Sequence, residues 1–335
     1  MKRLYIFRTN LTNLESYHSI TNIDQFKKEC WDFYLLQSLW FLENDYFDEV
    51  IIWRLTNSNH PDIIFEINGK KFIQRWVNNL NEVFKYTKPD ISLWRGGFKE
   101  YDEISKKNPK FFGLKLYLAA GKRLTPQYSG IYDRILVEDD LDKIQIKNSI
   151  PFYKTTNPNI FKPLNLDKKY DLCIISNFSQ LRYKGTDLII DEISKNPFLQ
   201  KLEICHIGNK SEIGISLSKQ KNVKNIEFLG SLDRFKINEI LNQSKFGIVN
   251  SNRIDGNPRV ITEILTSGTP LFINSKTRLL NYYKKFGVIE FNDINFIKKI
   301  MYGFENYDKT KKDLIDRLNR FDINNICKLN IESWV

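Results

Sequence analysis

Two carboxylates lie eight residues apart in the segment 251–263: Asp255 in a polar loop and Glu263 inside a predicted helix. The loop follows an apolar run, residues 246–249, that is typical of a buried strand. Backbone N–H groups at such a helix start, with the positive end of the helix dipole, favour an anion such as a pyrophosphate. The segment therefore predicts a ligand site. The simpler interpretation is that Asp255 and Asn257 only cap the helix, which would leave Glu263 unexplained.

The loop between these acids also suits close contact with a ligand. Gly256 allows close backbone approach, and Pro258 suits the first helical turn, where a missing N–H costs little. A second group of candidates lies after the predicted strand 171–176, where Arg182 and Lys184 precede a helix. Cations there could neutralise charge on a departing phosphate, or they could be ordinary surface charges.

Strands and helices alternate through the chain and lapse once, between about residues 150 and 169. This alternation predicts two α/β halves, each with a doubly wound and mainly parallel sheet. We expect domains at 1–155 and 165–305, and a helical segment at 306–335 that could cross back to the first domain. In the first half we expect strands at 4–7, 50–53, 62–65, 88–94, 114–118 and 132–137, and helices at 24–43 and 71–86. In the second half we expect strands at 171–176, 202–207, 225–229, 246–249, 270–273 and 288–291, and helices at 184–198, 235–244 and 278–286, with two more between 292 and 320.

Ligands of doubly wound sheets bind beyond the carboxyl ends of the strands. In the first half, cations and glycines fall at such ends: Arg95, Gly96, Gly97, Lys122 and Arg123. In the second half, Gly208 and Gly230 each close a strand and allow close approach, although either could be a simple turn.

Composition narrows the class of protein. The chain has 335 residues, of which 41% are hydrophobic, and a net charge of +11, as expected for a globular protein rather than a disordered one. The lysines are spread out and form no nucleic-acid arm, so they indicate either a solvated basic surface or a face on anionic lipid. The four cysteines form no C-x-x-C pair, which indicates buried free thiols in a reducing compartment. No apolar stretch of about 18 residues exists, so we expect a cytoplasmic protein, soluble or peripheral at the membrane.

The second half resembles the GT-B glycosyltransferases of the family-4 (GT4) type, over about residues 155–275. The resemblance rests on motifs in the family's order: Phe161-Lys162-Pro163, Arg182-Tyr183-Lys184-Gly185, His206-Ile207-Gly208, Phe228-Leu229-Gly230, Asp255-Gly256-Asn257-Pro258 through Glu263, and Gly268-Thr269-Pro270. The first half adds Lys88-Pro89-Asp90. The resemblance implies two Rossmann-like domains facing a cleft, and transfer of a sugar from a nucleotide-sugar to a hydroxyl acceptor with retention of anomeric configuration.

The resemblance also implies roles for the candidate residues. Glu263 would bind the donor's ribose hydroxyls, while Asp255, Lys184 and Arg182 would be catalytic, with Lys184 on the pyrophosphate. The other donor-binding residues would be Gly256, Asn257, Pro258, Gly208, Gly230 and Ser179. An acceptor, whether glycan, lipid or protein, would meet Arg95, Gly96, Gly97, Lys122 and Arg123. Neither metal nor cofactor would be needed beyond the nucleotide-sugar co-substrate, and no nucleic acid is expected as a partner.

The sequence departs from the family pattern at several places. Asp255 is one methylene shorter than the usual Glu, Phe178 stands where an Arg is usual, and no histidine follows Lys88-Pro89-Asp90. The first half also lacks the family's glycine-rich loop near its N-terminus.

Three other interpretations stay open. Asp140-Leu141-Asp142 is a D-x-D pattern of the kind that binds a metal in GT-A glycosyltransferases, or simply an acidic loop. An epimerase or phosphorylase could use the same fold, and so could a catalytically silent carbohydrate- or nucleotide-binding protein.

Overall fold

A computed structural model describes residues 1–8, 20, 22–55, 60–95, 99–119, 130–137, 148–178, 184–251, 258–277 and 280–334. The chain forms two compact units. The first unit comprises Met1–Asn157 and Ile323–Val335, and the second comprises Pro158–Asp322. The chain therefore passes from one unit to the other between Asn157 and Pro158, inside the segment where the sequence periodicity lapses.

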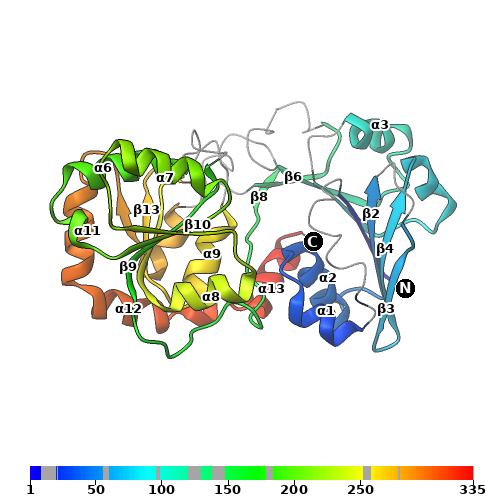
Figure 1. Ribbon diagram of the computed structural model, residues 1–335. Coiled ribbons are helices and arrows are strands. Elements are labelled where there is room, and N and C mark those ends of the chain that lie inside the picture. Colours follow the sequence, from blue (N-terminus) through cyan, green and yellow to red (C-terminus); the bar gives the residue numbers. More distant parts are fainter. Residues whose placement is uncertain are drawn as a thin grey trace. The chain divides into compact units, whose positions relative to one another are not determined.

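The first unit is built on an eight-stranded sheet with the order β3-β4-β2-β1-β5-β6-β7-β8 (Figure 1). All neighbouring strands are parallel except the β3–β4 pair, which is antiparallel. Its strands are β1 (Arg3–Phe7), β2 (Glu49–Leu55), β3 (Ile63–Ile67), β4 (Lys70–Val77), β5 (Ile91–Arg95), β6 (Leu114–Ala119), β7 (Arg134–Val137) and β8 (Ser149–Pro151). Its helices are α1 (Ile23–Glu29), α2 (Phe33–Glu43), η2 (Leu80–Lys85), α3 (Lys99–Lys107) and α13 (Ile323–Trp334).

Side chains alternate between the two faces of this sheet, and a different layer packs on each face. Phe7 of β1 and Trp53 of β2 belong to an apolar cluster that also includes residues of α3 and η2. Because side chains alternate along a strand, the next residues, Arg8 and Arg54, face the other side of the sheet. Helix α2 packs against β2 and β4 on that other side.

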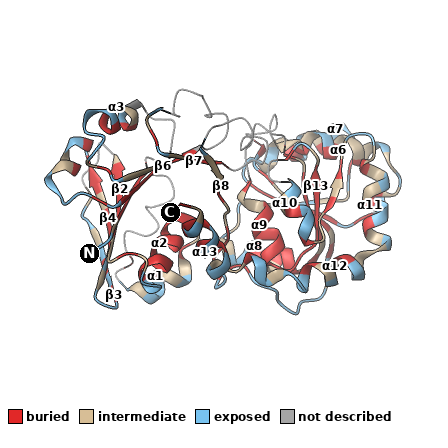
Figure 2. Ribbon diagram, turned by 180° about the vertical axis from the view of Figure 1, so that it is seen from behind, coloured by how far each residue is buried: buried red, intermediate tan, exposed pale blue. Residues whose placement is uncertain are grey.

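Helix α2 is buried almost all round, as Figure 2 shows. It starts at Asp32, whose side chain accepts hydrogen bonds from the N–H groups of Tyr34 and Leu35. Helix α13 covers it from outside: Trp40 Nε1 donates to Asn324 Oδ1 over 2.6 Å. A helix that is apolar on every side needs such cover on both sides.

Two predictions for this unit are wrong. The helix expected at 71–86 is strand β4 followed by the 3₁₀ helix η2, because β4 is an inner strand with both faces buried. The single helix expected at 24–43 is two helices, α1 and α2, separated at Cys30–Asp32, where Asp32 caps the second one. The sequence analysis also missed β8, α3 and, in the second unit, α7.

The second unit is built on a six-stranded sheet, all parallel, with the order β11-β10-β9-β12-β13-β14. Its strands are β9 (Tyr170–Ile175), β10 (Ile204–Ile207), β11 (Ile226–Gly230), β12 (Ser244–Val249), β13 (Leu271–Asn274) and β14 (Ile289–Phe291). Its helices are α6 (Thr186–Lys195), η6 (Leu199–Lys201), α7 (Ser211–Gln220), α8 (Arg234–Asn242), α9 (Arg259–Thr266), α10 (Leu280–Tyr283), η8 (Lys284–Phe286), α11 (Phe296–Glu305), α12 (Tyr307–Ile315) and η9 (Leu318–Phe321). The strands thus follow the Rossmann order, which reverses between β9 and β12.

Both units are doubly wound α/β domains, and the predicted fold class is confirmed. In the first unit the order reverses between β1 and β5, as it does between β9 and β12 in the second. The four cysteines are buried and form no disulfide, as predicted. Among the helices of the described segments, none is long and apolar enough to cross a bilayer.

Candidate active site in the second unit

A cavity of about 320 Å³ lies at the carboxyl ends of strands in the second unit. Its walls come from the segments after β9, β10 and β11 and from the start of α9, which follows β12. This is the edge where the strand order reverses and where doubly wound domains bind their ligands. The lining residues are Ile175, Ser176, Asn177, Lys184, Ile207, Gly208, Ser231, Leu232, Arg234, Ile237, Pro258, Arg259, Val260 and Glu263.

Glu263 is the buried acid of this cavity, with a side chain only 3% exposed. Its Oε1 lies 2.9 Å from Arg234 Nη1 and 3.8 Å from Arg259 Nε. The residues around it on α9 are fully buried, which fixes the helix against the sheet. A buried carboxylate is stable only when paired, and these two arginines supply the pairing.

The sequence analysis missed Arg234, which begins α8 directly after the capping residue Asp233. A cation at a helix N-terminus is unfavourable with respect to the helix dipole. An arginine at this position in the sequence could therefore have indicated an ionic partner outside its own helix.

Lys184 and Gly185 stand directly before α6, and Lys184 lines the cavity. Gly185 has a φ of 58°, in the left-handed region, and its carbonyl accepts a hydrogen bond of 2.9 Å from Asn250 Nδ2. A Cβ at this position would lie 2.5 Å from the same Asn250 atom. The turn that carries Lys184 is thus tied to the end of β12.

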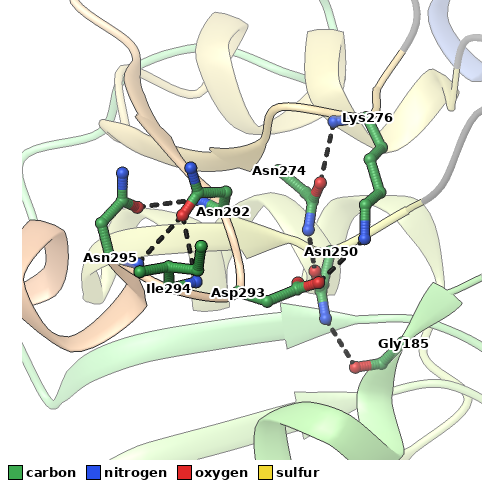
Figure 3. A network of polar contacts seen from close by, with 8 residues as sticks. All are labelled: Gly185, Asn250, Asn274, Lys276, Asn292, Asp293, Ile294 and Asn295. Carbon is green, nitrogen blue, oxygen red and sulfur yellow. Dashed lines mark hydrogen bonds and ion pairs between the residues drawn. The ribbon is translucent and has the colours of Figure 1, made fainter.

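Figure 3 shows that this tie continues across two more strand ends. Asn274 Nδ2 donates to Asn250 Oδ1 over 2.7 Å, and Lys276 N donates to Asn274 Oδ1 over 2.8 Å. Lys276 Nζ then forms an ion pair of 2.9 Å with Asp293. The network fixes the ends of β12 and β13 relative to each other.

Gly208 is required by the close approach of two strand ends, whereas Gly230 has open space around it and is favoured by its positive φ. A Cβ on Gly208 would lie 1.8 Å from the carbonyl oxygen of Ser176, closer than any real contact. Gly208 N donates to the Gly230 carbonyl over 2.8 Å, and Gly230 itself has a φ of 70°. Gly208 also lines the cavity, whereas Gly230, predicted to bind the donor, is not among the lining residues.

Ser176 is buried and contacts two buried polar side chains. Its Oγ lies 2.6 Å from Thr186 Oγ1 and 3.2 Å from His206 Nε2. Burial lowers the pKa of His206 to about 4, against a weaker opposing effect of the hydrogen bond with Ser176, so the ring is neutral at physiological pH. Phe178 packs on this ring with centroids 4.5 Å apart, which explains why a buried aromatic stands at this position.

The structure brings together only part of the predicted site. Lys184, Gly208, Pro258 and Glu263 line one cavity, whereas Arg95 ends β5 in the first unit, 5.2 Å from the ring of Tyr34. The remaining predicted residues lie outside the described segments: Asp255, Gly256, Asn257, Arg182, Ser179, Gly96, Gly97, Lys122 and Arg123. The D-x-D pattern at 140–142 lies outside them too.

The charge balance of the lining favours an anion. Among the described residues that line it, three cations, Lys184, Arg234 and Arg259, stand against one acid, Glu263. The start of α9 adds the positive end of a helix dipole. Within the described residues, no three metal-ligating side chains come together. The cavity therefore suits a ligand that has both phosphate oxygens and hydroxyl groups.

No protein-family model and no curated protein matches the chain. Solved structures do match over nearly its whole length. Sucrose-phosphate synthase from Thermosynechococcus elongatus is similar with a TM-score of 0.70 and 12% identity, over 100% of this chain and 98% of that chain. Anabaena HepE in complex with UDP has a TM-score of 0.70 and 11% identity, over 99% of each chain. A glycosyltransferase from Rickettsia africae has a TM-score of 0.65 and 13% identity, over 99% of this chain and 97% of that chain.

These similar structures are GT-B glycosyltransferases. The strand orders of the two units described above agree with that architecture independently. At 11–13% identity the similarity extends to the fold and not to the substrate. The protein has the GT-B fold.

Proposed function

We propose that the protein is a retaining glycosyltransferase that moves a sugar from a nucleotide-sugar donor to a hydroxyl acceptor. The observation that carries this proposal is the buried acid Glu263 beside three cations, Lys184, Arg234 and Arg259, in a cavity at the edge where the strand order reverses. The order of motifs from Phe161 to Pro270 supports membership of the GT4 type.

In this proposal the donor's two chemical halves meet different parts of the cavity. Glu263 accepts hydrogen bonds from the ribose hydroxyls, and its carboxylate is held in place for that by Arg234. Lys184 and the start of α9 hold the diphosphate. During transfer the bond from the anomeric carbon to the diphosphate oxygen breaks, a bond to the acceptor oxygen forms, and the acceptor's hydroxyl proton passes to the departing diphosphate. Charge that develops on the departing diphosphate is then stabilised by fixed cations and a helix dipole.

We further propose that no metal or cofactor takes part, since the cations of the cavity can supply the same electrostatic stabilisation. Activity should then persist in a chelator. A UDP-sugar is the first donor to test because the Anabaena neighbour was solved with UDP. The acceptor would be a glycan, a lipid or a protein. Peripheral binding to anionic membranes, suggested by the net charge of +11, stays a prediction that vesicle co-sedimentation can test.

The deciding experiment is a titration of the protein with UDP, GDP, ADP and CMP, with and without chelator, followed by donor turnover. We expect one nucleotide to bind with micromolar affinity to the native protein and at least tenfold more weakly to Glu263→Ala. Equal binding to both proteins would contradict the assignment of Glu263. Binding without turnover on any acceptor would instead indicate a catalytically silent protein.

A further inference from the structure

Asn250 directly follows β12 and has an amide side chain that makes two hydrogen bonds (Figure 3). Its Nδ2 donates to the Gly185 carbonyl over 2.9 Å, and its Oδ1 accepts from Asn274 Nδ2 over 2.7 Å. Asn250 itself is not among the described residues that line the cavity around Glu263. Any effect of Asn250 on a ligand in that cavity must therefore pass through the residues that it holds.

The chemistry of these two bonds suits an amide. The Gly185 carbonyl can only accept a hydrogen bond, so its partner must donate. The Nδ2 group of Asn274 can only donate, so its partner must accept. An aspartate at position 250 could not donate to Gly185, and an aliphatic side chain could make neither bond.

Asn274 fixes the orientation of the Asn250 amide. It lies on β13 and is buried, and its Oδ1 accepts a hydrogen bond of 2.8 Å from Lys276 N, which leaves its Nδ2 to face Asn250. If the Asn250 amide turned over, its oxygen would meet the Gly185 carbonyl and its nitrogen would meet the Asn274 nitrogen. Both bonds would be lost, so the donor of Asn250 stays directed at Gly185.

The turn at Lys184 and Gly185 is held at a second point by the next residue. Thr186 Oγ1 lies 2.6 Å from Ser176 Oγ, and both side chains are buried. Ser176 follows β9 and Asn250 follows β12, the two strands between which the order of the sheet reverses. The turn is therefore attached to the ends of both central strands.

The position of the backbone matters for Lys184 because a lysine is long and flexible. Its ammonium is a point charge on a four-carbon stem, so the main chain decides which part of the cavity it reaches. Lys184 lines the cavity and directly precedes Gly185, whose φ of 58° lies in the left-handed region. A Cβ on Gly185 would lie 2.5 Å from Asn250 Nδ2, so these two residues are closely packed as well as hydrogen-bonded. The turn cannot shift toward Asn250 unless Asn250 moves too.

We propose that Asn250 is a positioning residue for sugar transfer, which holds the turn where Lys184 contacts the donor's diphosphate. This role rests on the proposed function, since it needs a nucleotide-sugar in the cavity. Displacement of a contacting group by about 1 Å can cost on the order of 100-fold in rate. Asn250 thereby sets how strongly the site prefers a diphosphate over a monophosphate, while Glu263 contacts the ribose of either.

The test is a calorimetric titration with UDP, GDP and ADP and with the matching monophosphates UMP, GMP and AMP. The ratio of the two dissociation constants measures what the second phosphate contributes, whereas a general loss of folded protein lowers both affinities together. We expect the native protein to bind one diphosphate about tenfold more tightly than its monophosphate, the scale of one charged hydrogen bond. Asn250→Leu, which has a similar shape and no charge but can neither donate nor accept, should lose most of this preference. Its affinity for the monophosphate should be unchanged.

The matched control is Asn225→Leu. Asn225 directly precedes β11, at the opposite edge of the same sheet, and its Nδ2 donates to the carbonyls of Leu199 and Leu202 over 2.8 Å each. This variant also loses two hydrogen bonds of a strand-end amide, so it should have a lower melting temperature and keep the preference for a diphosphate. If Asn250→Leu does not fold, the smaller Asn250→Ala takes its place.

The variant Lys184→Met and the double variant Lys184→Met/Asn250→Leu show whether Asn250 acts through Lys184. Both should lose the preference for a diphosphate to the same extent, because a positioning residue has no effect once the residue that it positions is gone. A further loss of preference in the double variant would overturn the proposal.

An Asn250→Leu variant that keeps the native preference would overturn the role of Asn250 and leave the proposed function intact. A native protein that binds no nucleotide would overturn both. Native binding without any preference for a diphosphate would show that Lys184 contacts no second phosphate, and the role of Asn250 would fail with it.

Discussion

Glu263 of α9 and Arg234 of α8 form an ion pair of 2.9 Å in which the acid is almost fully buried and the arginine is 28% exposed. The exposed fraction lets Arg234 reach solvent or a ligand while it holds the carboxylate. The pair therefore links a structural contact between two helices to the proposed nucleotide site.

Replacing Glu263 by Gln should weaken nucleotide binding at least tenfold and lower the free energy of unfolding by about 1–3 kcal/mol, because a charged hydrogen bond is lost. The matched control is Glu239→Gln, which removes an exposed pair with Lys236 and should cost under about 1 kcal/mol. Urea unfolding and a UDP titration measure both effects. Unchanged UDP affinity in Glu263→Gln would contradict the role of this acid.

Variants of Arg234 test whether this residue positions Glu263 for the nucleotide or only stabilises the fold. Arg234→Ala should raise the dissociation constant for the nucleotide about tenfold, because Glu263 loses the group that orients it. Arg234→Lys keeps a charge but not the planar fork, so it should restore part of the affinity. If Arg234→Ala lowers stability and leaves nucleotide affinity unaltered, the arginine has no positioning role.

Gly208→Ala should destabilise the second unit by about 3 kcal/mol or more, because the added Cβ would overlap the Ser176 carbonyl at 1.8 Å. Gly69→Ala is the control: Gly69 has a φ of 76° and open space around it, so only backbone strain of about 1–2 kcal/mol is expected. The denaturant midpoints of the Gly208→Ala and Gly69→Ala variants measure this difference. Similar midpoints would show that the backbone around Gly208 can move aside.

The neutral, buried His206 predicts a loss of stability in acid. Its pKa is about 4 in the folded protein and about 6.5 when unfolded, so protons favour the unfolded chain as pH falls from 6.5 to 4. The loss should reach about 3 kcal/mol at pH 4 and stay constant below it. His206→Gln, which does not titrate, should lack this part of the pH dependence in unfolding measured from pH 7 to pH 4. Parallel curves for the two proteins would exclude the effect.

Much of the second unit could be predicted because its strands are short apolar runs that end in glycine or polar residues. The prediction failed at β4 in the first unit. Phe72, Trp76 and Leu80 are spaced by four and mimic a helical stripe, but an inner strand buries both faces and hides its alternation. The local pattern of apolar residues therefore could not distinguish a helix from a buried inner strand.

The site was less accessible to sequence reasoning than the fold. Arg234 and Glu263 are 29 residues apart, and only the packing of α8 beside α9 brings them together. Arg8 and Arg54 each look ordinary in sequence. Their burial is a property of the folded unit alone.

Helix α13 gives the first unit an unusual order of assembly. Residues 323–334 belong with residues 1–157, and Asn330 bonds with Tyr153 while Asn324 bonds with Trp40. The second unit is one continuous segment, so it can finish folding during synthesis. The first unit is made first but must wait, with the outer face of α2 uncovered, until α13 has left the ribosome.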